Sequence, residues 1–336
     1  MKRAVLDQVA LDCHLDEAAV AAALDLAGAR PGRDDWRRFA SRVSLGAGVA
    51  ALAAAVIMFV AANWHELAVV GRFALAHAAL LACVGVALWK PAPQAMGRAA
   101  LSLAILVSGA LLALYGQAYQ TGADLYELFF AWAALTLPFA LAGASGASWA
   151  IWWCIVNLGL GIFAGTLPIG QNVFWWFDRW RPDTAVMCLG IAAIDFAGAA
   201  GFAALGRTRF SAHAPRWLSR LLLTLAFGYG TAASLLALGE SSATAVIPAF
   251  ALLSIATAAL ALRSRSDVFP LALVAGAWIT VSTVMIARWL EHGMNEAGVF
   301  VLAIWVIGTS SGTAFALMRW VRTWRLRDDD AMESTA

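Results

Sequence analysis

An aspartate in the middle of an apolar run is the residue of this sequence best placed to do chemistry inside a membrane. Asp195 lies about eleven residues into the run 184–205, roughly 17 Å along a helix and therefore near the midplane of a bilayer. A carboxyl group at that depth costs several kcal/mol if it is charged and unpaired. Its candidate hydrogen-bonding partners are Asn157, at similar depth in the run 147–166, and Tyr229. We expect a mostly neutral Asp195 that faces the bundle interior, toward the fifth or seventh span, and serves either as interhelical glue or as a proton relay.

Two polar motifs at the ends of apolar runs form a second candidate site. They are AANWHEL at 61–67 and YGQAYQTGADLYELF at 115–129. Gly122 is suited to a positive φ, and Asp124 is suited to capping the helix that follows. These polar groups either bond one another in an ordered hairpin turn or line an outward-facing pocket for a ligand or partner. The candidate residues are Asn63, His65, Glu66, Arg72, Gln117, Tyr119, Thr121, Asp124 and Tyr126.

Most enzymatic chemistries find no support in the sequence. His65 and Glu66 make only the first half of a zinc-protease motif, because no second histidine follows at helical spacing. An outer metal site made of His65, His77 and His292 is geometrically conceivable, but no other feature of the sequence supports it. The four cysteines, Cys13, Cys83, Cys154 and Cys188, form no CxxC pair, and no phosphate-binding glycine loop or nucleophile elbow is present. We therefore expect no enzyme, no metal and no cofactor.

The elements that position these residues are membrane helices. The chain is 62% hydrophobic and only 13% charged, which is far from the composition of a soluble domain. The net charge of +2 excludes a nucleic-acid-binding protein with a basic face. Ten apolar runs are each close to the ~20 residues that cross a hydrocarbon core, and the fourth is short enough to be tilted or re-entrant. They are 44–62, 70–89, 98–117, 128–143, 147–166, 184–205, 218–239, 244–262, 268–287 and 297–318.

The distribution of basic residues predicts the orientation of this all-α bundle. Of 23 lysines and arginines, only Arg72, Arg179, Arg181 and Arg288 fall in loops on the expected outer side. Both termini are therefore predicted to be cytoplasmic. Tryptophans such as Trp89, Trp149, Trp217 and Trp289 lie near the span ends, as expected for an interfacial belt. Abundant alanine and only two lysines are typical of the codon usage of a GC-rich bacterium, which is an inference about the source only. We expect the helices to lie in the bacterial inner membrane.

The sequence predicts three segments: a cytoplasmic helical head at 1–42, a membrane domain at 43–320 and a cytoplasmic tail at 321–336. In the head, Asp16 is predicted to cap a helix that ends at Gly28 and Pro31, after a shorter helix near residues 3–11. Within the bundle, the GxxxG pairs at 161–165 and 308–312 are predicted to serve packing inside the molecule more than dimerisation.

The two polar motifs carry a family resemblance. The pattern F-x-A-A-N-W-x-E-L, then G-R, then G-Q-x-Y-x-T-G-A-D-x-Y-x-L-F resembles a bacterial multi-pass membrane family, domain of unknown function 2157. The resemblance covers roughly residues 1–165. It implies a fold type and a membrane location, but no reaction.

Two functions from different classes remain open. The sequence slightly favours a non-catalytic envelope scaffold, sensor or assembly protein that contacts an envelope protein partner through the outer motifs. The alternative is a proton-coupled secondary transporter of a small solute, because ten spans divide into two halves of five with opposite orientation. The lipid bilayer is a partner in both cases, nucleic acid is a partner in neither, and the substrate is not identified.

Overall fold

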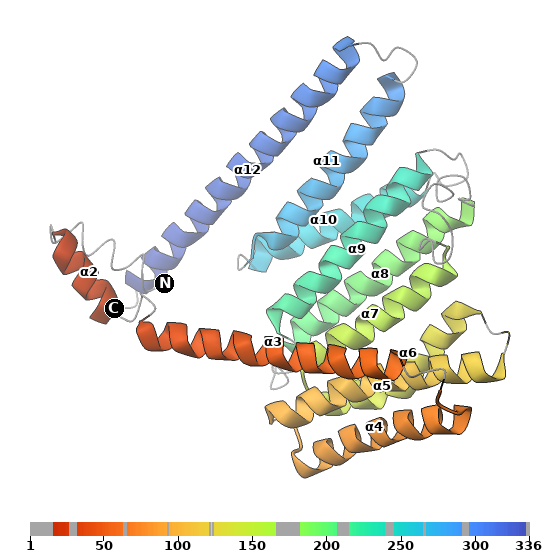
Figure 1. The fold of residues 1–336 in the computed structure, drawn as a ribbon. Coiled ribbons are helices and arrows are strands. Elements are labelled where there is room, and N and C mark those ends of the chain that lie inside the picture. Colours follow the sequence, from red (N-terminus) through yellow and green to blue (C-terminus); the bar gives the residue numbers. More distant parts are fainter. Residues whose placement is uncertain are drawn as a thin grey trace. The chain divides into compact units, whose positions relative to one another are not determined.

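The structure is a computed structural model that describes residues 16–26, 32–62, 66–92, 94–120, 122, 124–165, 182–206, 215–238, 245–264, 267–290 and 296–333. All regular structure within these ranges is α-helical (Figure 1). The predicted all-α membrane fold is confirmed. Backbone packing divides the chain into two units, residues 1–72 and 73–336, and each is described by itself below.

The first unit contains α2, Glu17–Leu26, and α3, Arg33–Ala62. The Asp16 carboxylate accepts a hydrogen bond from the Ala19 backbone N–H at 2.7 Å, so the predicted cap of α2 is confirmed. Gly28, Pro31 and the expected helix near residues 3–11 lie outside the described residues. α3 runs without a break across position 42, from its acidic first turn at Asp34 and Asp35 to the end of the first expected span.

The predicted spans coincide with the helices of the second unit. Nine helices within the described ranges are long and apolar enough to cross a membrane, and α3 covers the remaining expected span, 44–62. The fourth expected span, α6, is a full 19-residue helix with Pro138 inside it, long enough to cross rather than re-enter. The helices of this unit are α4 Val69–Trp89, α5 Ala95–Tyr119, α6 Leu125–Gly143, α7 Gly146–Phe163, α8 Pro182–Leu205, α9 Arg216–Ala237, α10 Val246–Ser264, α11 Phe269–Leu290 and α12 Glu296–Glu333.

Two groups of helices make up the second unit (Figure 1). In the first group, α5, α6 and α7 pack on one another, and α4 contacts α5 through Ala87, Ala100 and Leu101. In the second group, α8, α9, α10 and α11 pack together, and α12 packs on α11. α7 contacts α8 and α9, and so forms the junction between the groups.

Small residues and tryptophans build the contacts inside these groups. Trp132 Nε1 donates to the Ile105 carbonyl of α5 at 2.6 Å, and Trp152 Nε1 donates to the Ala133 carbonyl of α6 at 2.8 Å. The Trp132 ring lies where a side chain at Gly109 would be, so the close approach of α5 and α6 requires glycine there. Indoles inside the bundle therefore act as hydrogen-bonding wedges between helices.

The tryptophan belt is present only in part. Trp89, Trp217 and Trp289 are exposed, as expected at headgroup level. Trp149 is different, because its ring packs edge-on against Trp152 and Phe202, and its Nε1 is buried without a hydrogen-bonding partner in the described residues. Trp149 lies in the first turn of α7, at the predicted span end, and its ring packs between helices because α8 covers this side of α7.

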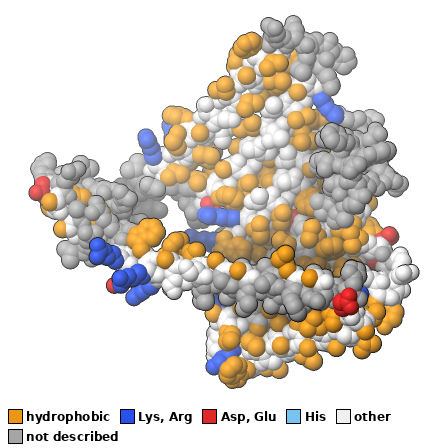
Figure 2. Space-filling view, viewed as in Figure 1, with side chains coloured by type: hydrophobic (Ala, Val, Ile, Leu, Met, Phe, Trp, Pro, Cys, Tyr) orange, Lys and Arg blue, Asp and Glu red, His pale blue; other side chains and the backbone are white. Residues whose placement is uncertain are grey.

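The outer surface of the spans is apolar. Figure 2 shows hydrophobic side chains spread across the visible face, as expected where lipid replaces water. On α12, a side chain at Gly308 or Gly312 would meet no described atom within 4 Å. The prediction that this GxxxG pair packs inside the molecule was therefore wrong. In the other pair, Gly161 is buried, whereas Gly165 ends the helix with φ +69° and open space around it.

Candidate functional site

Asp195 lies in the middle of α8 with none of its side chain exposed. Its Oδ1 accepts two hydrogen bonds, from Trp153 Nε1 at 2.5 Å and from Asn157 Nδ2 at 2.9 Å. Both donors belong to α7 and are four residues apart, which places them on one face of that helix. The expected bond between Asp195 and Asn157 is present, and Asp195 faces the fifth span as predicted.

A glycine makes room for this arrangement. Gly198 lies three residues after Asp195 on α8, and a Cβ added there would be only 2.5 Å from Cζ2 of Trp153. The Trp153 ring also contacts Phe202, with centroids 6.1 Å apart. The indole is thus fixed between Gly198 and Phe202 with its N–H directed at the carboxyl group.

Two oxygens of this cluster have no partner. Asp195 Oδ2 and Asn157 Oδ1 are both buried, and neither has a hydrogen-bonding partner among the described residues. The Asn157 amide is already engaged, since Nδ2 also donates to the Trp153 carbonyl at 3.2 Å. Buried polar groups are rarely left unpaired in native structures, and the exceptions call for an explanation. Both oxygens can therefore accept a further hydrogen bond, and Asp195 Oδ2 can alternatively bind a proton.

No basic residue lies in the described parts of α7 or α8 to neutralise a charged Asp195. The cost of a charge at this depth is therefore not offset by a cation on either of the two helices that form the cluster.

Tyr229, the other predicted partner, lies on α9 and packs against Ala185, Cys188 and Ala233. The two hydrogen bonds to Asp195 Oδ1 come from α7 instead.

The outer motif residues are only partly described. Asn63, His65 and Thr121 lie outside the described residues, and so does the expected contact of Asn63 with Gln117. Glu66 and Arg72 belong to the first unit, where Arg72 Nε donates to the Leu67 carbonyl at 3.0 Å.

In the second unit, the motif lies at the end of α5 and the start of α6. Tyr119 stacks near Tyr115 and Phe73, with ring centroids 4.8 and 6.2 Å away, and Gln117 is exposed in the same turn. Tyr126 packs edge-on against Phe163, with centroids 5.2 Å apart. The structure therefore brings Tyr119 and Gln117 together at the end of one helix, and Tyr126 to the end of α7.

The turn between α5 and α6 follows the prediction at Gly122 and departs from it at Asp124. Gly122 has φ +64°, as expected. Asp124 occupies the position before α6, but its carboxylate accepts no hydrogen bond from the first turn. Capping by the Asp124 side chain was therefore a wrong prediction.

Two residues of the Asp195 cluster were missed by sequence reasoning. Trp153 is one helical turn before Asn157, a spacing that could have identified it as a residue of the same face. Gly198 follows Asp195 by three residues, and this helical spacing places both on the same face of α8. Within the described ranges, no three His, Cys, Asp or Glu side chains lie close enough together to hold a metal.

Comparison with known proteins supports the family resemblance. No curated protein and no solved structure matches the chain. Residues 12–149 match the model of the family described as "Predicted membrane protein (DUF2157)". This match includes both polar motifs and ends at the start of α7. The chain is thus a multi-pass membrane protein whose residues 12–149 are similar to the DUF2157 family.

Proposed function

We propose that this chain is a non-catalytic protein of the bacterial inner membrane that works as a proton-coupled secondary transporter of a small solute, with Asp195 as the proton-binding group. The observation that carries the proposal is the buried Asp195 Oδ2, which has no described partner although the other carboxyl oxygen accepts two bonds. A residue that served only as glue would have both oxygens satisfied.

The position of Asp195 supports the same reading. If α3 is counted as the first span, α7 is the fifth and α8 the sixth, so the bonds of Asp195 cross from one half of the chain to the other. In transporters built from two halves of opposite orientation, coupling-ion sites lie near the midplane at the boundary between the halves.

Protonation supplies a physical means of coupling. Hydrogen bonds to a carboxylate are roughly twice as strong as those to a neutral acceptor. A proton on Asp195 therefore weakens the bonds from Trp153 and Asn157, and loosens the junction between α7 and α8. Loss of the proton tightens it again, so proton binding shifts the relative stability of two arrangements of the halves.

A second candidate function has a different support. Tyr115 and Tyr119 are 50% and 64% exposed at the end of α5, next to the exposed Asp124 and Glu127 at the start of α6. Such an aromatic and acidic face suits an envelope protein partner, and the function is then that of a scaffold or sensor.

The test uses everted membrane vesicles that contain the full chain and an acidic interior. Solutes of different classes are added one at a time, and release of the proton gradient is followed with a fluorescent dye. We expect at least one class to release the gradient with the wild-type chain, and Asp195→Asn to abolish this release at equal protein level. Glu127→Gln, an exposed acid away from the junction, is the matched control and should behave as wild type.

The scaffold function gives a different result. No solute then releases the gradient, and a photo-crosslinker placed at Tyr119 captures one protein partner. That outcome would reject the transporter.

A further inference from the structure

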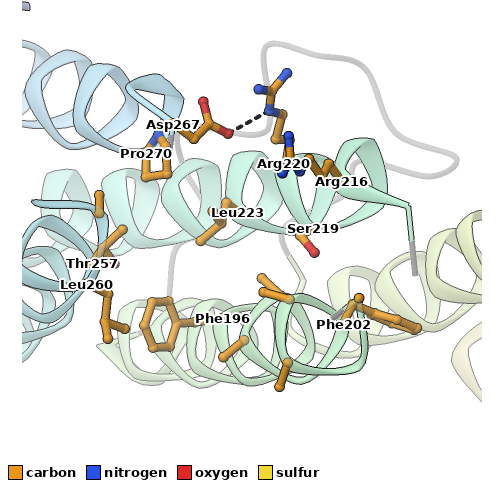
Figure 3. Close-up of a pocket in the computed structure, with 16 residues that line it drawn as sticks. Phe196, Phe202, Arg216, Ser219, Arg220, Leu223, Thr257, Leu260, Asp267 and Pro270 are labelled. Atoms are coloured by element: carbon orange, nitrogen blue, oxygen red, sulfur yellow. Dashed lines mark hydrogen bonds and ion pairs between the residues drawn. The ribbon is translucent and has the colours of Figure 1, made fainter. Parts of the chain in front are cut away.

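A pocket of about 480 Å³ lies between α8, α9, α10 and α11 (Figure 3). One part of its lining comes from helix ends: α8 ends at Leu205, α9 begins at Arg216 and α11 begins at Phe269. The pocket therefore starts at the level where spans leave the membrane and extends between the helices. Its volume lies within the range of roughly 300–1,000 Å³ that is usual for small-molecule sites.

The deeper walls of the pocket are apolar. Phe196 of α8, Leu223 of α9 and Leu260 of α10 face it from three helices (Figure 3). An apolar hollow within the thickness of a bilayer loses its dispersion contacts if it stays empty. A hydrocarbon chain is the filling that the surrounding membrane itself provides.

The charged side chains lie at the end of the pocket where the helices end. Arg220 Nε donates to Asp267 Oδ2 at 2.8 Å, and its guanidinium lies 5.5 Å from the Phe269 ring. Arg216 lines the same pocket, and its guanidinium has no ion pair or hydrogen bond with any residue that the structure describes. Two guanidinium groups thus face one carboxylate, which leaves a net positive charge in the lining.

We propose that this pocket binds a membrane lipid with an anionic phosphate headgroup. The headgroup phosphate lies against Arg216, whose planar guanidinium matches phosphate geometry, and one acyl chain lies along Phe196, Leu223 and Leu260. Basic pockets between membrane helices at the membrane surface are typical binding sites for anionic headgroups. A free phosphate ion would satisfy Arg216 but leave the apolar walls uncovered, so the lining favours a lipid. This site is separate from Asp195, which does not line the pocket.

The affinity of two lipids for the full purified chain tests the proposal. Phosphatidylglycerol and phosphatidylcholine with identical oleoyl chains are titrated against the protein in detergent, and bound lipid is counted by native mass spectrometry. We expect the wild type to prefer phosphatidylglycerol. Arg216→Gln should weaken phosphatidylglycerol binding about fivefold, and phosphatidylcholine binding less, because the choline cation offsets the charge of its phosphate.

Two further variants test whether the charge of the lining controls phosphatidylglycerol binding, and whether an arginine outside the pocket contributes to it. Asp267→Asn removes the one carboxylate of the lining, so it should strengthen phosphatidylglycerol binding. Arg263→Gln, an exposed arginine at the end of α10 that does not line the pocket, is the matched control and should bind as wild type.

The apolar part has its own variant. Ala203 lines the pocket and its side chain is exposed, so a phenylalanine there has room to occupy the pocket. Ala203→Phe should therefore reduce binding of both lipids. Thermal unfolding of the variant is measured to show that the chain still folds.

Several outcomes would overturn the proposal. They are equal binding of the two lipids by the wild type, an equal loss in Arg216→Gln and Arg263→Gln, and undiminished lipid binding by a folded Ala203→Phe. Inorganic phosphate that displaces phosphatidylglycerol at equal concentration would instead identify a soluble anion as the occupant, and reject the lipid.

Discussion

The Asn157 amide lies 2.9 Å from Asp195 Oδ1 and joins α7 to α8 across 38 residues of sequence. The same Nδ2 donates to the Trp153 carbonyl one turn earlier in α7, which fixes the orientation of the amide. One amide therefore positions the carboxyl group while its own oxygen, and the second carboxyl oxygen, stay buried and unpaired among the described residues.

Two substitutions of Asp195 separate the loss of its acidic group from the loss of its hydrogen bonds. Asp195→Asn keeps the acceptor for Trp153 and Asn157, so its thermal unfolding should stay close to wild type. Asp195→Ala leaves both donors buried without an acceptor, and should lower the free energy of unfolding by roughly 1 kcal/mol per lost hydrogen bond. Thermal unfolding in detergent checks both. Equal stability of the two variants would show that these bonds contribute nothing.

The protonation state of Asp195 has a spectroscopic signature. Burial at the membrane midplane disfavours a charge that no cation offsets, so we expect a protonated carboxyl group at neutral pH. Infrared spectroscopy should show its C=O band in the wild type and lose that band in Asp195→Asn. A spectrum with no such difference would contradict a neutral Asp195.

The close contact at Gly198 offers a matched pair of variants. Gly198→Ala places a methyl group 2.5 Å from the Trp153 ring, and should destabilise the fold by about 1–3 kcal/mol. Gly201→Ala, one turn further along α8, meets no described atom within 4 Å and should be neutral or slightly stabilising. Thermal unfolding of both variants is the measurement. Similar effects would mean that Trp153 is not wedged against α8.

Ser145 caps α7 at a buried turn. Its Oγ accepts from the Ser148 backbone N–H at 3.2 Å and bonds Ser148 Oγ at 2.9 Å, which in turn bonds Ser102 Oγ of α5. Ser145→Ala should therefore cost about 1 kcal/mol of folding free energy. Ser108→Ala is the control, because Ser108 bonds the Ala104 carbonyl of its own helix and its loss should be nearly neutral.

Topology is tested by reporter fusions. The distribution of lysine and arginine predicts cytoplasmic signals at Pro93, Ala214 and Arg327. It predicts the opposite side for fusions at Asp124, Asp178 and Met294. Two inverted sites would exclude ten spans with both termini inside.

The sequence by itself determined the membrane helices and the presence of an acid within them. A spanning segment must satisfy its backbone hydrogen bonds internally, so a long apolar run has little choice but to be a helix. This is why the expected spans coincide with α4 to α12, and why the conformation at Gly122 followed from local turn chemistry.

Only the tertiary structure decided which face of each helix meets which neighbour. Lipid is as apolar as the bundle interior, so a membrane helix carries little amphipathic signal to set its rotation. That rotation decides which side chains meet. Asp195 bonds Asn157 in place of the expected Tyr229, the Trp153 ring lies against Gly198, and Arg220 pairs with Asp267. The last of these pairs is 47 residues apart in the chain, a distance at which hydropathy says nothing about contact.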